Sequence, residues 1–101
     1  MVRRVFLSIF ENVARPTREG IERHVEYLRQ LDDQGALIVC GPFHGGSGGM
    51  VCFLADTPEE ADKVARADPF VELGFKKFSL HEIDRAMREN GYLLGPCAST
   101  P

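Results

Sequence analysis

Two side chains in this sequence are of the types that could exchange a proton with a small molecule. His24 lies in the run RHVEYL, and Asp68 lies directly before Pro69 in the run ARADPF. A carboxylate can fix the tautomer of a histidine and stabilise its imidazolium, so that the histidine acts as a general acid or base near neutral pH. Such chemistry requires that the two side chains meet in the folded chain.

Helical spacing directs both side chains toward the interior. In the first helical pattern, which follows Pro16 and runs to about Asp33, His24 belongs to the stripe of apolar residues at Ile21, Val25, Leu28 and Leu31. In the second pattern, Asp68 extends at i+7 the inward stripe of Ala61, Val64 and Ala65. Pro69 is predicted to end this second helix at Asp68, because a residue before proline avoids helical geometry.

A buried carboxylate is costly unless it is paired. His24 is the inward-facing residue that could carry the opposite charge, so the sequence predicts a His24–Asp68 pair. A structural interpretation stays open, in which His24 is a satisfied core histidine and Asp68 only bonds nearby backbone amides. No Ser or Cys nucleophile stands at a spacing that ties it to the pair, so a hydrolase triad is not indicated.

Residues near proline-marked bends are the next candidates for a binding site. Phe43 and Phe70 each adjoin such a bend and are expected to form pocket walls, and Arg23 beside His24 could meet an anionic ligand. Lys76 and Lys77 are expected to be solvated. The run GPFHGGSGG joins two strands and has no Lys, so we interpret it as a flexible hairpin connection and not as a phosphate-binding loop.

The predicted elements follow the order β-α-β-β-α-β. Strands are expected at residues 5–10, 36–40, 50–54 and 75–80, and helices at about 17–33 and 57–68. Thr57, Pro58 and Glu60 are typical of a capped helix start with a capping box. A short further helix is expected at 83–89. This order predicts an α+β ferredoxin-like fold, with two helices on one face of a four-stranded antiparallel sheet.

The strands predict a partner for the second face of the sheet. The runs ALIVC and MVCFL do not alternate apolar and polar residues, and Val5, Leu7 and Ile9 lie opposite Phe6 and Phe10. Both faces are therefore apolar, and the chain has no third layer to cover the second one. We expect a homodimer in which two copies pack their sheets face to face.

Composition narrows the class of protein. The chain has 101 residues with a formal net charge of −3, which fits one domain and gives no basic surface for nucleic acid or for a membrane. The apolar run at Val5–Phe10 is too short for a signal peptide, so a cytoplasmic protein is expected. Cys40, Cys52 and Cys97 are expected to be core thiols, with a redox or metal role as the alternative; no zinc-ligand spacing occurs.

Several short motifs, in their order and spacing, resemble the YCII-related domain proteins over roughly residues 2–80. They are Arg23-His24 with Tyr27, Leu28 and Leu31, then Gly35-Ala36-Leu37, Gly41-Pro42-Phe43, the glycine-rich hairpin, and Ala67-Asp68-Pro69-Phe70. The resemblance implies a dimeric α+β barrel with a characteristic polar pair at His24 and Asp68. The chain then divides into a YCII-like domain at 1–83 and a C-terminal helix and tail at 84–101, where it departs from the family pattern.

The resemblance also suggests a kind of reaction. Some relatives in the resemblance are cofactor-free dehydrochlorinases of chlorinated hydroxyquinols, and muconolactone isomerases share the barrel. We therefore expect a lyase or isomerase that uses no cofactor and no metal, with His24 and Asp68 as catalytic residues. Arg23, Gly41, Pro42, Phe43 and Phe70 are expected to bind a small, aromatic or enolisable substrate. The alternative is a dimeric binding or regulatory module with the same pocket and no catalysis.

Overall fold

The computed structural model describes residues 3–94. Eight elements follow one another along the chain: β1 (Arg4–Asn12), α1 (Arg18–Asp33), β2 (Leu37–Pro42), β3 (Gly49–Ala55), α2 (Pro58–Arg66), α3 (Pro69–Glu72), β4 (Lys76–Ile83) and the 3₁₀ segment η1 (Arg88–Leu93). Cys97 lies outside the described residues. Among residues 3–94, no helix is both long and apolar enough to cross a membrane.

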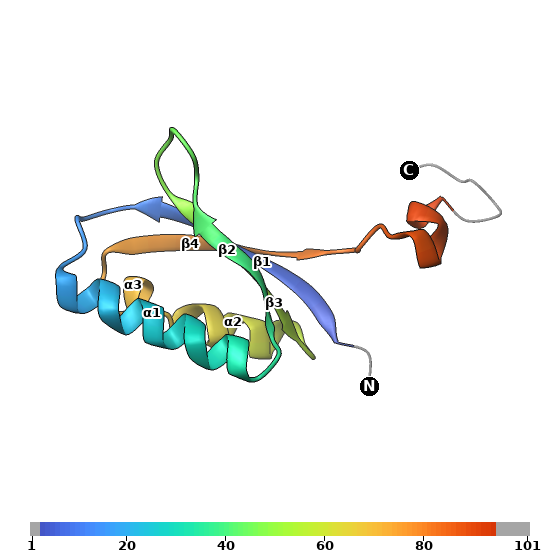
Figure 1. Ribbon diagram of the computed structural model, residues 1–101, viewed down its shortest axis with the longest axis horizontal. Helices are drawn as coiled ribbons and strands as arrows, with labels where there is room; N and C mark the ends of the chain where they lie inside the picture. Colours follow the sequence, from blue (N-terminus) through green and yellow to red (C-terminus); the bar gives the residue numbers. More distant parts are fainter. Residues whose placement is uncertain (1–2, 95–101) are drawn as a thin grey trace.

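The four strands form one antiparallel sheet in the order β2-β3-β1-β4. All three helices lie on one side of this sheet, and η1 lies away from both layers (Figure 1). The order and layering confirm the predicted ferredoxin-like α+β fold, which is the unit from which dimeric α+β barrels are built.

The core lies between the sheet and the helices. Phe6 and Phe10 on β1 and Phe53 on β3 point toward the helices, and the rings of Phe6 and Phe53 stack with centroids 6.1 Å apart. Ala61 and Ala65 on α2 are buried against this cluster, as their spacing predicts. Two small residues one turn apart allow α2 to approach the aromatic rings closely.

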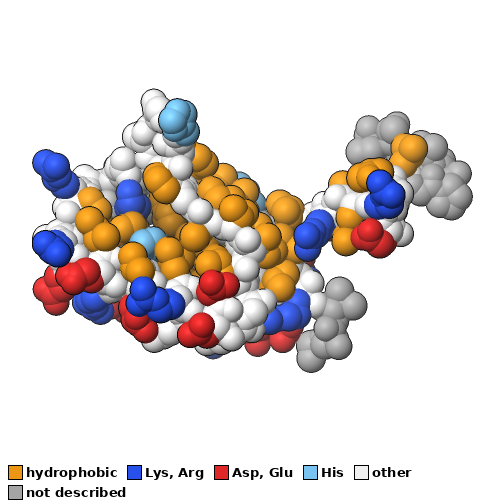
Figure 2. Space-filling view, viewed as in Figure 1, with side chains coloured by type: hydrophobic (Ala, Val, Ile, Leu, Met, Phe, Trp, Pro, Cys, Tyr) orange, Lys and Arg blue, Asp and Glu red, His pale blue; other side chains and the backbone are white. Residues whose placement is uncertain are grey.

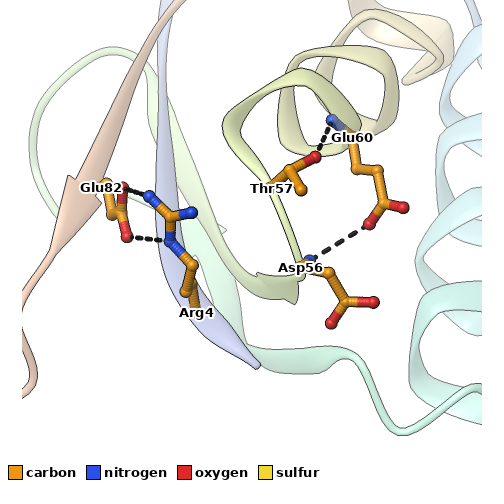
Figure 3. Close-up of polar contacts among 5 residues, drawn as sticks. All are labelled: Arg4, Asp56, Thr57, Glu60 and Glu82. Carbon is orange, nitrogen blue, oxygen red and sulfur yellow. Dashed lines mark hydrogen bonds and ion pairs between the residues drawn. The ribbon is translucent and has the colours of Figure 1, made fainter. Parts of the chain in front are cut away.

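Both long helices begin at a threonine cap. Thr17 Oγ1 accepts from the Gly20 amide at 3.0 Å, and Thr57 Oγ1 accepts from the Glu60 amide at 3.1 Å. The carboxylate of Glu60 accepts from the amide of Asp56, one residue before the cap, at 3.2 Å (Figure 3). The predicted capping box is therefore shifted by one residue, because a capping box would direct Glu60 to the Thr57 amide.

The predicted core stripe of α1 is confirmed at His24, Leu28 and Leu31 and is wrong at Ile21 and Val25. Ile21 is 45% exposed and Val25 is 42% exposed, whereas Gly20 and Leu31 are buried. The half-buried residues of the helix are His24, Tyr27 and Leu28. The inward face thus runs through Gly20, His24, Tyr27, Leu28 and Leu31, with Gly20 and Tyr27 in place of the predicted Ile21 and Val25. Gly20 packs closely on the sheet side of the helix, since an added Cβ there would lie 2.5 Å from the ring of Phe75.

Two further predictions about helices are corrected. Pro69 does not end the second helix: α2 ends at Arg66, and Pro69 instead begins the short helix α3. Proline suits the first position of a helix, where its missing N–H would have no partner. The helix expected at 83–89 is also absent, because β4 continues to Ile83 and the next helical residues are Arg88–Leu93.

Candidate active site

His24 and Asp68 are in contact although 44 residues separate them in the chain. His24 Nδ1 lies 2.7 Å from Asp68 Oδ1. The side chain of Asp68 is 1% exposed and that of His24 is 13% exposed, so the contact is shielded from water. Because a carboxylate can only accept a hydrogen bond, Nδ1 carries the proton and Nε2 keeps the basic lone pair.

Asp68 is held by its position between two helices. As the N-cap of α3, it accepts from the Phe70 amide at 2.9 Å with the same oxygen that contacts His24. Its other oxygen, Oδ2, is buried and has no hydrogen-bond partner among the described residues. A buried carboxylate with one unsatisfied oxygen gives His24 a strong acceptor, which favours a proton on Nδ1 and stabilises the imidazolium.

Aromatic rings fix the plane of the imidazole. The Phe70 ring stacks on His24 with centroids 3.8 Å apart and planes 10° from parallel. Phe10 meets His24 edge-on at 6.5 Å, and Tyr27 lies nearly parallel at 6.4 Å. With one nitrogen bonded and one face covered, the imidazole is limited to its Nε2 edge for contact with a ligand.

His24 lines a cavity of about 400 Å³ between α1, α3 and the β2–β3 hairpin. Most of the wall is apolar, and Figure 2 shows hydrophobic side chains gathered over the middle of this side of the molecule, with charged groups along its margin. The lining residues are Phe10, Pro16, Ile21, His24, Leu28, Cys40, Gly41, Pro42, Gly48, Gly49, Met50, Val51, Phe70 and Lys76.

The structure brings together some of the predicted substrate-binding residues and not others. Gly41, Pro42 and Phe70 line the cavity with His24. Phe43 is not among the lining residues and is 44% exposed at the start of the hairpin loop. Arg23 also lies outside the lining, where its guanidinium forms an exposed ion pair with Glu72 at 3.4 Å.

Ten of the fourteen lining residues were not among the predicted site residues, and the two that bear most on the chemistry are Phe10 and Lys76. Lys76 was expected to be solvated, yet it contributes to the cavity wall. It pairs with Asn12 in the register and shares the helix side of β4 with the half-buried Phe78 and Leu80. The inward position of Lys76 could be predicted from the sequence, because alternation along the strand from Phe78 and Leu80 places Lys76 inward and Lys77 outward.

The His, Cys, Asp and Glu side chains of the described residues do not form a metal centre at this site. Within residues 3–94, no three His, Cys, Asp or Glu side chains gather in a way that could hold a metal ion. Cys40 lines the cavity and Cys52 is buried, and both are free thiols. Burial raises the pKa of each thiol above its ordinary value, so both are held in the protonated, weakly nucleophilic form.

Comparisons with known proteins agree with this fold. The profile of the YCII-related domain matches residues 5–83. An uncharacterized protein of Bacillus subtilis (strain 168), YjpA, is 30% identical over 77 residues, which cover 76% of this chain and 91% of that protein.

A solved structure has a similar fold at low identity. It is the 5-chloro-2-hydroxyhydroquinone dehydrochlorinase (TftG) of Burkholderia phenoliruptrix AC1100 in complex with 2,5-dihydroxybenzoquinone. The similarity has a TM-score of 0.66 at 19% identity, and it covers 84% of this chain and 97% of the other.

Proposed function

The chain belongs to the family of YCII-related domain proteins, and on this premise we propose that it is a small cofactor-independent enzyme of the lyase or isomerase type. The observation that carries the proposal is the 2.7 Å contact between His24 and the buried Asp68 at the wall of a cavity. His24 is proposed to transfer the proton, and Asp68 to hold the imidazole in one tautomer and orientation.

The proposed reaction begins at His24 Nε2, the basic atom on the ring edge opposite Asp68. This nitrogen takes a proton from a hydroxyl or an activated C–H of the substrate, and Asp68 stabilises the resulting imidazolium. In a lyase, the electron pair of a broken C–H bond forms a double bond to the neighbouring carbon, whose leaving group departs with its own bonding electrons. The imidazolium then gives its proton to that group or to water. In an isomerase the same electron pair instead shifts a double bond, and the imidazolium returns the proton at another atom.

The shape of the cavity supports a flat substrate. Phe10 and Phe70 present rings beside His24, and a cavity of about 400 Å³ is of the size that small-molecule sites have. The similar solved structure holds 2,5-dihydroxybenzoquinone, a planar enolic ring. We therefore propose a small aromatic or enolisable substrate for this chain as well.

We also propose that the protein works as a homodimer in the cytoplasm. No helix within residues 3–94 covers the second face of the sheet (Figure 1). The strand register places Leu7 and Ile9 of β1 on that face, together with Met50, Cys52 and Leu54 of β3. A second copy of the same sheet would remove this apolar surface from water.

A non-catalytic binding module is the second candidate. Apart from Cys40, the residues that line the cavity include only two ionisable side chains, His24 and Lys76. Such a largely apolar wall also suits a protein that only holds or senses a small molecule.

Exchange of a carbon-bound proton distinguishes the two functions. In D₂O, we expect the wild-type protein to accelerate loss of the ring C–H signal of 2,5-dihydroxybenzoquinone, and His24→Ala to lower that rate by about 10²–10⁴-fold. His44→Ala is the matched control, since His44 lies in the exposed hairpin loop and does not line the cavity. Binding of the quinone without any acceleration of exchange would favour the binding module.

A further inference from the structure

Lys76 brings a positive charge to a cavity that is otherwise almost wholly apolar. It is the one Lys or Arg among the lining residues. Its Nζ donates a hydrogen bond to Asn12 Oδ1, opposite it on β1, and lies 5.3 Å from the centroid of the Phe70 ring. The same ring stacks on His24. The ammonium and the imidazole are therefore both placed by contacts with Phe70.

No carboxylate of the described residues forms an ion pair with Lys76. Nearby acidic groups have other partners: Glu11 is paired with Lys77, and Asp68 with His24. Lys77 is the useful contrast, because its side chain is 68% exposed and points to the opposite face of β4. Of two adjacent lysines, one is thus a paired surface group, and the other is a half-buried residue of the cavity wall whose ammonium has a neutral partner in an exposed contact.

We propose that Lys76 is the anion-binding residue of the cavity, and that the ligand is a planar ring bearing one anionic oxygen group, as a phenolate, enolate or carboxylate. This inference rests on the proposed function and names its class of substrate. The uncompensated ammonium favours such a ligand over a neutral one, since a charge-assisted hydrogen bond is about twice as strong as a neutral one.

The same charge serves the proposed chemistry. When His24 removes a proton from the ligand, negative charge develops on the oxygen conjugated with the reacting atom. An ammonium beside that oxygen stabilises it, and the contacts with Asn12 and Phe70 limit the positions that the Lys76 ammonium takes before the ligand arrives. Lys76 thereby determines which ligands enter and His24 determines what happens to them.

A matched pair of probes tests the charge preference. The affinities of 4-fluorobenzoate and 4-fluorobenzamide, which have nearly the same shape, are measured by ¹⁹F NMR titration of the full chain. We expect the wild-type protein to prefer the benzoate, and Lys76→Met to weaken benzoate binding by about tenfold, while benzamide binding changes less than about twofold. Lys77→Met should change neither affinity, and Lys76→Arg should keep the preference.

Each other outcome counts against the proposal. If Lys76→Met lowers the affinity for both probes equally, only the apolar stem of the lysine contributes to binding. An equal loss of benzoate affinity in Lys77→Met would point to general surface charge, and no preference in the wild type would overturn the inference outright. The wild-type protein separates this inference from the proposed function: a benzoate preference without any acceleration of proton exchange keeps the ligand class and overturns the catalysis.

Discussion

At the scale of single residues, Asp68 performs two tasks that substitution can separate. It caps α3 through the Phe70 amide and accepts the proton-bearing nitrogen of His24. Asp68→Ala removes both contacts and should lower the free energy of unfolding by about 2–4 kcal/mol, since a lost cap costs about 1 and an unpaired buried donor about 1–3. Asp68→Ser can keep the cap but is too short to reach His24.

Urea unfolding of the two variants measures the difference. We expect Asp68→Ser to be more stable than Asp68→Ala by about 1 kcal/mol, the usual value of an N-cap. Long-range ¹H–¹⁵N spectra should show a protonated Nδ1 on His24 in the wild type and a mixture of tautomers in both variants. Equal stabilities for the two variants would mean that the cap contributes nothing measurable.

Tyr27 makes the stability of the protein depend on alkaline pH. Burial, and then the nearby charge of Asp68, raise the pKa of Tyr27 above its ordinary value of 10.0. Its hydroxyl donates to the Val64 carbonyl at 2.6 Å. The unfolded chain therefore ionises this phenol first, so the stabilisation is complete below about pH 10 and is lost as the pH rises from there toward the folded-state pKa.

At pH 8, Tyr27→Phe should lower the free energy of unfolding by about 1 kcal/mol, because the hydrogen bond of the hydroxyl is missing. Above pH 10, the free energy of unfolding should fall less steeply with pH in Tyr27→Phe than in the wild type. Urea unfolding at several pH values between 8 and 11 measures both. Tyr92→Phe is the control, because Tyr92 is 63% exposed and should leave the pH dependence unchanged. Parallel curves for Tyr27→Phe and the wild type would contradict the prediction.

The contact of His24 with Asp68 was predictable from spacing, but its local geometry was not. Periodicity places both residues inward, and the cost of a lone buried carboxylate pairs them. The position of Asp68 depends instead on what Pro69 does, and a proline can follow one helix or begin the next. Lys76 shows the opposite case, because its alternation with Phe78 and Leu80 along the strand already places it on the inward side.

At the scale of elements, the β2–β3 hairpin shapes one wall of the cavity through its glycines. Gly48 has a φ of +84°, and a Cβ added there would run into the carbonyl oxygen of Phe10. Gly46 in the same loop has no atom within 4 Å of the corresponding position. The hairpin therefore needs glycine where it returns to the sheet and tolerates other residues at its tip.

Gly48→Ala should lower the free energy of unfolding by about 2 kcal/mol or more, because left-handed geometry and a backbone clash both oppose a side chain. The control, Gly46→Ala, should stay within about 0.5 kcal/mol of the wild type. Thermal or urea unfolding measures both. We also expect Gly48→Ala to weaken ligand binding, since Gly48 lines the cavity. A stable Gly48→Ala with unchanged binding would show that the hairpin adjusts freely.

The order of the elements could be predicted, whereas their ends and rotations depend on tertiary contacts. All four strands and the two main helices lie where the patterns place them. The inward position of Gly20 on α1 goes with its close contact with Phe75, a residue from a separate segment, and periodicity cannot show such a contact. The continuation of β4 to Ile83 has a similar cause, because β1 reaches as far as Val5 to pair with it, and Arg4 binds Glu82 at 2.6 and 2.7 Å (Figure 3).

At the scale of the whole molecule, the uncovered face of the sheet changes from apolar at its centre to polar at the edge strand β4. Its centre on β1 and β3 is apolar, and Val39 on β2 continues this surface because it pairs with Cys52. On the edge strand β4 the same face carries Lys77, Ser79 and His81. A partner sheet would therefore bury the β1–β3–β2 side and leave β4 nearer to water.

Val39→Glu tests this arrangement with little effect on the protomer itself. Val39 is 54% exposed in the single chain, so a carboxylate there stays hydrated in the monomer, but it would be buried without a partner at the proposed interface. Sedimentation velocity at micromolar concentration should show a dimer for the wild type and a monomer for Val39→Glu. Val13→Glu is the matched control, since Val13 is 60% exposed beyond the end of β1 and should leave the dimer intact. If the wild type sediments as a monomer, the second face must have some other cover, and if Val39→Glu remains a dimer, two copies must meet through another surface.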